Sequence, residues 1–345
     1  MTKYQSNVCK GIAILMMYFH HLFIYKNLII KYDVSFWPFS QPVGWMLGLL
    51  FKACVAIFAF ITGYGYCKKK NEINHYFKMV FRRLTKLMFK YWFVFILFFI
   101  IGIFTEHNAV YKTGNALKTI FYVLADFFGL SYGFKTPTMN NTWWYITIAI
   151  ILIVVSPSFI YLSKRKTVSV IVLAVIIAGG FISPAGRLNV LFTYLLPLEL
   201  GIICAQYSVF EKIKKFFDSK HYIDLIVSFV ILGTISYYRE FVNFRFLIDA
   251  AFAVLVCYIV FRLTSRTGRV SKVLYTFGKY SANGYLIHGF ILYYYFKEIV
   301  YSTKYFLAIW VLLAVVMLGI SWLIEKVKKI ILYNKLENNI LEKMN

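Results

Sequence analysis

Charged residues are scarce in this chain: they make up 15% of its 345 residues, whereas 61% are apolar and 20% are aromatic. A soluble domain carries about 25% charged residues, because its surface faces water. The scarcity therefore excludes an ordinary soluble protein. It predicts an all-α, polytopic membrane protein, a bundle of transmembrane helices whose backbone polar groups are paired within each helix.

Acidic residues are scarcer still, with 14 Asp and Glu against 38 Lys and Arg, which leaves a formal net charge of +24. Such an excess can indicate nucleic-acid binding. Here, however, the basic residues occur in short clusters between apolar runs rather than along one amphipathic face. This pattern is typical of topology signals and of an anion site, and no nucleic-acid partner is expected.

Cysteine contributes only five residues, and no two of them have CxxC spacing: Cys9, Cys54, Cys67, Cys204 and Cys257. All five lie in or beside apolar runs rather than in external loops. We therefore expect no disulfides and no metal site. No small-residue cleavage site follows the first apolar run, so this run is expected to remain as an uncleaved first span.

Long apolar runs dominate the sequence, and about ten of them can cross a hydrocarbon core of about 30 Å. The predicted spans are 10–30, 44–66, 87–104, 143–162, 168–183, 187–206, 222–238, 246–263, 274–296 and 305–324. With the N-terminus inside, basic clusters such as 68–70 and 164–166 fall on the cytoplasmic side, as the positive-inside rule requires. We therefore predict cytoplasmic termini, one transmembrane domain at 1–330 and a cytoplasmic tail at 331–345.

Residues 105–142 form an ambiguous segment. If 115–133 crossed the membrane, every later loop would be inverted and the basic clusters would lie outside. We therefore interpret 105–142 as an external excursion. Its apolar stretch, which includes Phe121 and Phe127 and also Asp126, is expected either to lie on the membrane as an amphipathic helix or to re-enter it as a lid over a cavity.

The first apolar run carries a cation at its start, Lys10, and two adjacent histidines in its middle. In a helix, Lys10 and His21 lie about 16 Å apart along the axis and within about 20° of the same face, whereas His20 is turned about 80° away. Only one imidazole is therefore expected to share a site with Lys10. An ionisable group at bilayer depth costs at least about 2.5 kcal/mol and indicates a functional site. The alternative is a neutral, packed His21 bonded to a backbone carbonyl.

A second cation, Lys52, lies within the second predicted span. Helical spacing places it on one face with three small residues that permit close helix packing: Ala56, Ala59 and Gly63. A buried ammonium group needs an acidic partner, and the candidates are Glu199, Asp126 and Asp249. The alternative is that Lys52 extends outward to the membrane surface.

A basic face is predicted where the next helix enters the membrane. Arg82, Arg83, Lys86 and Lys90 follow helical spacing, so they form a cationic surface at the cytoplasmic mouth. Arginine side chains bind phosphate oxygens bidentately, which suits a phosphate-bearing ligand. The alternative is that these residues contact anionic lipids and set the topology.

Several of these segments together resemble the membrane-bound acyltransferase-3 family, whose members acylate surface glycans and lipid-linked sugars. The family's basic residue, ten spacers and histidine match Lys10 to His21, with Lys in place of the usual Arg. Its second-helix ending is similar to 60–64, and its next basic pattern to 83–86. Its Trp-containing helix start, its Leu-Gly helix and its late Ser…Tyr-Leu-x-His segment resemble 140–152, 194–205 and 278–292.

The resemblance implies a bacterial multi-pass plasma-membrane acyltransferase that uses acetyl-CoA as donor. The acceptor would be a hydroxyl of a cell-surface or capsular polysaccharide or of its lipid-linked precursor. His21 would be the base or a transient acyl carrier. Lys10 would help to bind CoA phosphates with the basic group Arg82, Arg83 and Lys86. The expected acceptor side consists of Lys52, Trp143, Trp144, Glu199 and His288.

Two of these acceptor-side residues have further interpretations. His288 follows Ser281 by seven residues, which places both on one helix face, and the alternative role for His288 is structural packing. Glu199 could orient an imidazole or pair with Lys52. The competing function is a transporter or flippase for a lipid-linked sugar. Such transporters tend to show internal repeats and paired broken helices, whereas here only Pro197 clearly interrupts a predicted span and no repeat is visible.

Overall fold

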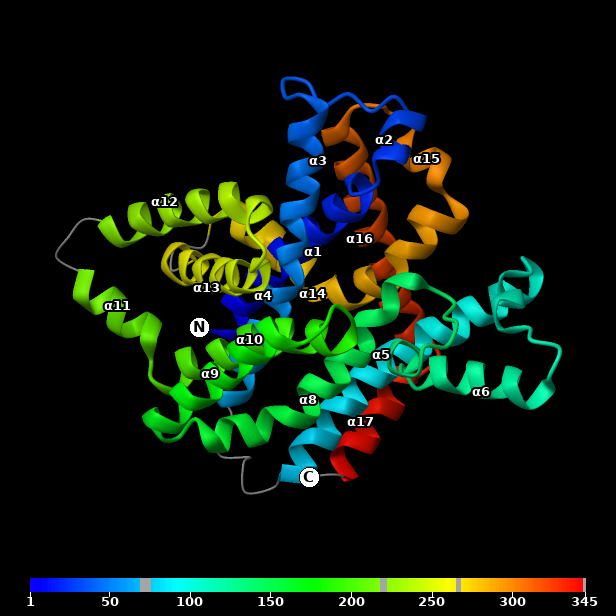
Figure 1. Ribbon diagram of the computed structural model, residues 1–345. Helices are drawn as coiled ribbons and strands as arrows, with labels where there is room; N and C mark the ends of the chain where they lie inside the picture. The colour runs from blue at the N-terminus through cyan, green and yellow to red at the C-terminus, as the bar shows by residue number, and fades with distance from the viewer. Residues whose placement is uncertain (69–75, 218–221, 265–267, 344–345) are drawn as a thin grey trace. The chain divides into compact units, whose positions relative to one another are not determined.

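The computed structural model describes residues 1–68, 76–217, 222–264 and 268–343. Within these ranges the chain is almost wholly helical, and β-structure is limited to one isolated bridge between Ser35 and Tyr305. Figure 1 follows the helices from α1 near the N-terminus to α17 near the C-terminus. Lys69 and Lys70, from one of the predicted basic clusters, lie outside the described residues. The predicted all-α, polytopic membrane class is confirmed.

Among the described residues, six segments are long and apolar enough to cross a membrane, and each overlaps a predicted span. They are Gln41–Cys67, Phe77–Phe104, Asn141–Leu162, Arg187–Gln206, Arg245–Leu263 and Phe306–Ile330. The predicted spans at 10–30, 168–183, 222–238 and 274–296 are also helical, but they are not among these six. The total of ten spans and the cytoplasmic position of both termini stay predictions.

The chain divides into two compact units, and each unit gathers segments from distant parts of the sequence. The first contains residues 1–71, 156–281 and 298–316, and the second contains 72–155, 282–297 and 317–345. Four helices contribute residues to both units: α8 (Trp144–Leu162), α14 (Arg269–Gly289), α15 (Lys297–Tyr301) and α16 (Phe306–Ile330).

The first unit begins with α1 (Lys3–Phe23), whose N-terminus is closed by reciprocal hydrogen bonds between Thr2 and Gln5. The run predicted as a first span at 10–30 is divided between α1 and α2 (Lys26–Lys31). The other elements of this unit are α3 (Gln41–Leu50), η1 (Phe51–Ala53), α4 (Cys54–Cys67), α9 (Lys166–Ile182), α10 (Arg187–Gln206), α11 (Val209–Phe217), α12 (Ile223–Tyr238), η5 (Arg239–Phe241), α13 (Arg245–Leu263) and most of α15 (Lys297–Tyr301).

Glycines bring the helix backbones of the first unit into direct contact. A Cβ added at Gly63 of α4 would lie 2.0 Å from the carbonyl oxygen of Leu198 in α10, and one at Gly201 would lie 2.2 Å from that of Phe60. The small-residue face predicted for the second span is therefore used for helix packing, although Lys52 itself lies in η1 and is exposed. A Cβ at Gly11 of α1 would lie 1.9 Å from the carbonyl oxygen of Leu274 in α14.

The second unit is built around α5 (Tyr76–Phe104) and the first part of α8. Its other elements are η3 (His107–Tyr111), α6 (Ala116–Phe127), α7 (Ser131–Phe134), η4 (Asn141–Trp143), η6 (Phe290–Tyr295) and α17 (Tyr333–Lys343). The predicted cytoplasmic tail is thus largely the helix α17. A second proline, Pro157, lies inside α8 in addition to Pro197 inside α10, so the expectation of a single internal proline was wrong.

Helix α6 lies in the segment that the sequence predicts as an external excursion. Its exposed apolar side chains recur every three or four residues and form one stripe: Leu117, Ile120, Phe121 and Leu124. The buried side of the same helix carries Ala125 and Asp126. With 12 residues, α6 is too short to cross a bilayer core of about 30 Å. The choice between an interfacial and a re-entrant position stays open.

Candidate active site

Helix α1 carries the two residues that the sequence analysis placed at the centre of the site. Because α1 is continuous from Lys3 to Phe23, the helical relation between Lys10 and His21 holds, and both side chains are half-buried. The first unit also holds α1 by side-chain bonds to its backbone. The indole Nε1 of Trp310 donates to the Leu15 carbonyl at 2.9 Å, and the hydroxyl of Tyr301 donates to the Leu22 carbonyl at 2.7 Å.

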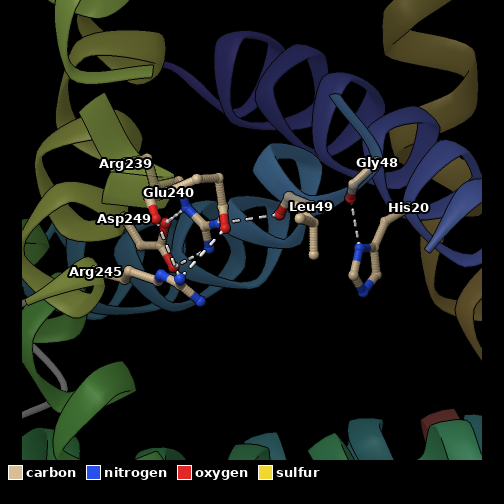
Figure 2. A network of polar contacts seen from close by, with 7 residues as sticks. All are labelled: His20, Gly48, Leu49, Arg239, Glu240, Arg245 and Asp249. Atoms are coloured by element: carbon tan, nitrogen blue, oxygen red, sulfur yellow. Dashed lines mark hydrogen bonds and ion pairs between the residues drawn. The ribbon is translucent and has the colours of Figure 1, made fainter. Parts of the chain in front are cut away.

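His20 is bonded to the backbone of α3. Its Nδ1 lies 2.7 Å from the carbonyl oxygen of Gly48 (Figure 2). The rings of His20 and His21 pack edge to face, with centroids 5.0 Å apart. His20, the neighbour of His21, therefore bonds to a backbone carbonyl and also contacts the His21 ring.

A buried ion-pair cluster lies on the other side of the same α3 turn. Arg239 donates from Nε to Oδ1 of Asp249 at 2.6 Å and from Nη2 to Oδ2 at 2.9 Å, and its Nη1 donates to the Leu49 carbonyl at 3.1 Å (Figure 2). Glu240 completes the cluster through bonds to Arg239 and Arg245. The sequence analysis did not identify Arg239, and it treated Asp249 only as a partner for Lys52.

Glu199, the acid predicted for the acceptor side, is fully buried in α10. It accepts a hydrogen bond from the Ser163 hydroxyl, and this hydroxyl is the partner that the structure gives it in place of Lys52 or an imidazole. Lys52 is exposed, and its role stays a prediction.

The predicted basic face lies on α5, in the second unit. Arg82 and Arg83 are half-buried and Lys86 is exposed on one continuous helix. Helix α17 packs against α5, because the Tyr333 hydroxyl donates to the Phe89 carbonyl at 2.8 Å. The start of α17 therefore lies beside Phe89 of α5.

Glu337 of α17 interacts electrostatically with two lysines of α5, Lys86 and Lys90. Burial raises the pKa of the Glu337 carboxyl, and the positive charges of Lys90, Lys328 and Lys86 oppose that rise. Lys328 is itself buried and donates to Glu325 at 3.1 Å. The C-terminal segment thus places an acidic residue within electrostatic reach of Lys86 and Lys90.

Trp143 and His288 belong to a buried region of the second unit. The Trp143 indole donates to the Leu286 carbonyl at 2.9 Å, and Nδ1 of His288 lies 2.7 Å from the Tyr285 carbonyl. His288 is fully buried. Trp144 is half-buried, with its ring centroid 5.9 Å from that of Tyr132. The second unit therefore brings Trp143 and His288 onto adjoining segments.

Asp126 anchors the predicted external excursion. Its carboxylate accepts hydrogen bonds from the hydroxyls of Tyr111, Ser131 and Thr138 and from the backbone N–H of Met139, at 2.5 to 2.9 Å. Its own carbonyl accepts from the Tyr91 hydroxyl at 2.6 Å. Asp126 thus ties η3, α6 and the segment before η4 to α5, rather than pairing with a lysine.

The candidate residues are divided between the two units. Those in the first unit are Lys10, His21, Lys52 and Glu199, and those in the second are Arg82, Arg83, Lys86, Trp143, Trp144 and His288. Their catalytic and binding roles stay predictions.

Comparison with known proteins gives one informative match. A family model described as an acyltransferase domain matches residues 3–326, which is nearly the whole chain. No curated protein and no solved structure matches this chain.

Proposed function

Because this chain belongs to the acyltransferase-3 family, we propose that it transfers acetyl from acetyl-CoA to a glycan hydroxyl. The acceptor is a cell-surface or capsular polysaccharide or its lipid-linked precursor, and the protein lies in the bacterial plasma membrane. The observation that carries the proposal is the family match over residues 3–326 of a multi-pass membrane chain. The continuous helix α1, with Lys10 and His21 on one face, supports it further.

In this proposal His21 is the reacting imidazole. As a base, it removes the proton of the acceptor hydroxyl while the hydroxyl oxygen attacks the thioester carbonyl. A new C–O bond forms, the C–S bond breaks, and the proton passes from His21 to the departing CoA thiolate. As an acyl carrier, His21 attacks the thioester first, the C–S bond breaks, and the CoA thiolate leaves with the imidazole proton. The acetyl group then passes from the imidazole to the hydroxyl oxygen, and the hydroxyl proton returns to the imidazole. Both routes use an imidazole held away from bulk water.

The cations of the proposal bind the donor. Arg82, Arg83 and Lys86 bind the CoA phosphates, since guanidinium groups form bidentate bonds with phosphate oxygens. Lys10 adds positive charge on the face of α1 that carries His21. Lys52, Trp143, Trp144, Glu199 and His288 are assigned to the acceptor, where aromatic faces and polar groups suit a sugar.

Mass spectrometry of the host's surface glycan tests the proposal. Cells that lack this chain are complemented with wild type, His21→Ala or His20→Ala at equal membrane abundance. We expect acetyl groups on the glycan with wild type, none with His21→Ala, and a smaller loss with His20→Ala. Full acetylation with His21→Ala would exclude the proposed chemistry. An unacetylated glycan that is correctly exported only when the chain is present would instead indicate a flippase.

A further inference from the structure

The long apolar segment Gln41–Cys67 is not one continuous α-helix. The turn η1 interrupts it between α3 and α4. A turn of this kind pairs each N–H with the carbonyl three residues back instead of four, and it often marks a functional hinge. The carbonyls of Gly48 and Leu49, just before the turn, accept hydrogen bonds from side chains of other elements (Figure 2).

The bond to Gly48 determines the tautomer of His20. A carbonyl oxygen can only accept, so Nδ1 of His20 carries the proton across the 2.7 Å contact. A neutral imidazole has one N–H, which leaves Nε2 of His20 as the acceptor nitrogen. Figure 2 shows this second nitrogen pointing away from Gly48. The bond therefore fixes the orientation of the ring and the tautomer of its neutral form.

The bond to the Leu49 carbonyl holds the end of α3 from the side opposite α1. Arg239 grips both carboxylate oxygens of Asp249, and its side chain is only 4% exposed. A bidentate guanidinium–carboxylate pair has a fixed geometry. The Leu49 carbonyl is thus held by a rigid group. The last turn of α3, at 48–49, is fixed by α1 through His20 and by η5 through Arg239.

His20 in turn contacts the next residue of α1. Its ring packs against the ring of His21 at an interplanar angle of 66°. We propose that His20 is a positioning residue for His21: its bond to the Gly48 carbonyl fixes the α1 turn that presents His21, and the Arg239–Asp249 pair keeps this anchor in place. This inference rests on the proposed function, in which His21 is the reacting imidazole.

Two substitutions of His20 separate the effect of its hydrogen bond to Gly48 from the effect of its ring packing against His21. His20→Asn places an amide nitrogen near the position of Nδ1, so it still donates to Gly48, although it lacks the ring. His20→Phe keeps a ring against His21 and cannot donate. We expect kcat to stay within about threefold of wild type for His20→Asn and to fall at least about tenfold for His20→Phe, because small misplacements of a reacting group are costly. The KM for acetyl-CoA should be unchanged in both.

The Arg239–Asp249 pair can be tested with a variant and a matched control. Arg239→Lys keeps the charge but loses the bidentate grip on Asp249, so kcat should fall in the same direction as for His20→Phe. Arg165→Lys is the control, because Arg165 is exposed, lies in the same unit and is not part of the cluster around Asp249. It should leave kcat unchanged.

A second readout does not depend on acyl transfer. The rate at which diethyl pyrocarbonate modifies His21, measured by mass spectrometry, reports the placement of that imidazole. We expect His20→Asn to match wild type within about twofold and His20→Phe to differ at least about threefold, as a displaced imidazole requires. If this pattern holds while wild type transfers no acetyl group, the proposed function fails and the positioning role stands.

Two results would overturn the positioning role. Wild-type kcat and wild-type His21 labelling in folded His20→Phe would show that the Gly48 bond has no effect on His21. A His20→Asn protein as inactive as His21→Ala, with His21 labelling unchanged, would make His20 a reacting base in its own right.

Discussion

At the residue scale, the clearest structural role belongs to Asp126. Four donors from three segments lie 2.5 to 2.9 Å from its buried carboxylate, and the Tyr91 hydroxyl makes a longer contact with it at 3.3 Å. An ionised carboxylate has lone pairs for all of them and no proton to place. The hydrogen bonds of Asp126 therefore hold together the segment that the sequence analysis could describe only as an excursion.

Asp126→Asn should destabilise the protein. The amide nitrogen cannot accept, so at least one of the donors, such as the Tyr111 hydroxyl or the Met139 N–H, loses its partner, at a cost of about 2 kcal/mol in the free energy of unfolding. We expect the melting temperature in detergent to fall by about 3–6 °C. The control is Asp33→Asn, since the Asp33 side chain is 86% exposed. Equal melting temperatures for both variants would contradict this role for Asp126.

The residues of the candidate site were only partly predictable from sequence. The relation between Lys10 and His21 follows from helix periodicity alone, because both lie on one uninterrupted helix. The bond from His20 to Gly48 and the pairing of Arg239 with Asp249 were missed. Both depend on which backbone carbonyl or carboxylate of a distant segment lies opposite a side chain, and a hydrophobicity pattern carries no such information.

At the element scale, α4 and α10 are held together by small residues. Without a hydrophobic driving force between helices in lipid, close backbone packing contributes much of the association. Gly63 and Gly201 allow this approach, each with a carbonyl of the other helix where a side chain would stand. The packing of α4 should therefore be sensitive to a single methyl group at these positions.

Gly63→Ala and Gly65→Ala form a matched pair within α4. A Cβ at Gly63 would meet the Leu198 oxygen at 2.0 Å, whereas one at Gly65 would meet nothing within 4 Å. Gly63→Ala should lower the free energy of unfolding by about 1–3 kcal/mol through overpacking. Gly65→Ala should leave it unchanged or raise it by up to about 1 kcal/mol, because Ala favours the helix. Equal melting temperatures for the Gly63→Ala and Gly65→Ala proteins would show that α4 and α10 are not in close contact.

Elements were easier to predict than their interruptions. The apolar runs located the helices because a segment in lipid must pair its own backbone groups. The turn η1 inside the second span was not predicted, because its sequence 51–53 carries no proline or glycine to signal it. Helix α17 was not predicted, because residues 331–345 were described only as a cytoplasmic tail; Tyr333 anchors this helix to α5.

At the scale of the whole molecule, the dominant property is the excess of 38 basic over 14 acidic residues. Topology accounts for part of this excess. The proposal assigns the basic face of α5 to a polyanionic donor. An interaction of this kind is screened by salt, since the Debye length falls from about 10 Å at 0.1 M to about 3 Å at 1 M ionic strength.

Acetyl-CoA binding to the purified protein should therefore weaken steeply with salt. Arg82→Ala or Arg83→Ala should weaken it about tenfold at low salt, because each variant removes charge-assisted hydrogen bonds. Arg245→Ala serves as the control, as an exposed arginine outside the proposed donor site. Calorimetry over a range of salt concentrations measures both effects. Unaltered binding in the Arg82 and Arg83 variants would place CoA elsewhere on the protein.

The central claim is that this membrane protein moves an acetyl group from CoA to a glycan through His21. The most direct measurement supplies radiolabelled acetyl-CoA and unacetylated glycan from a deletion strain to the purified protein in lipid nanodiscs. It then compares wild type with His21→Ala. The account predicts label in the glycan and an equal amount of free CoA thiol with wild type, and neither above background with His21→Ala. Equal incorporation by the two proteins would contradict it.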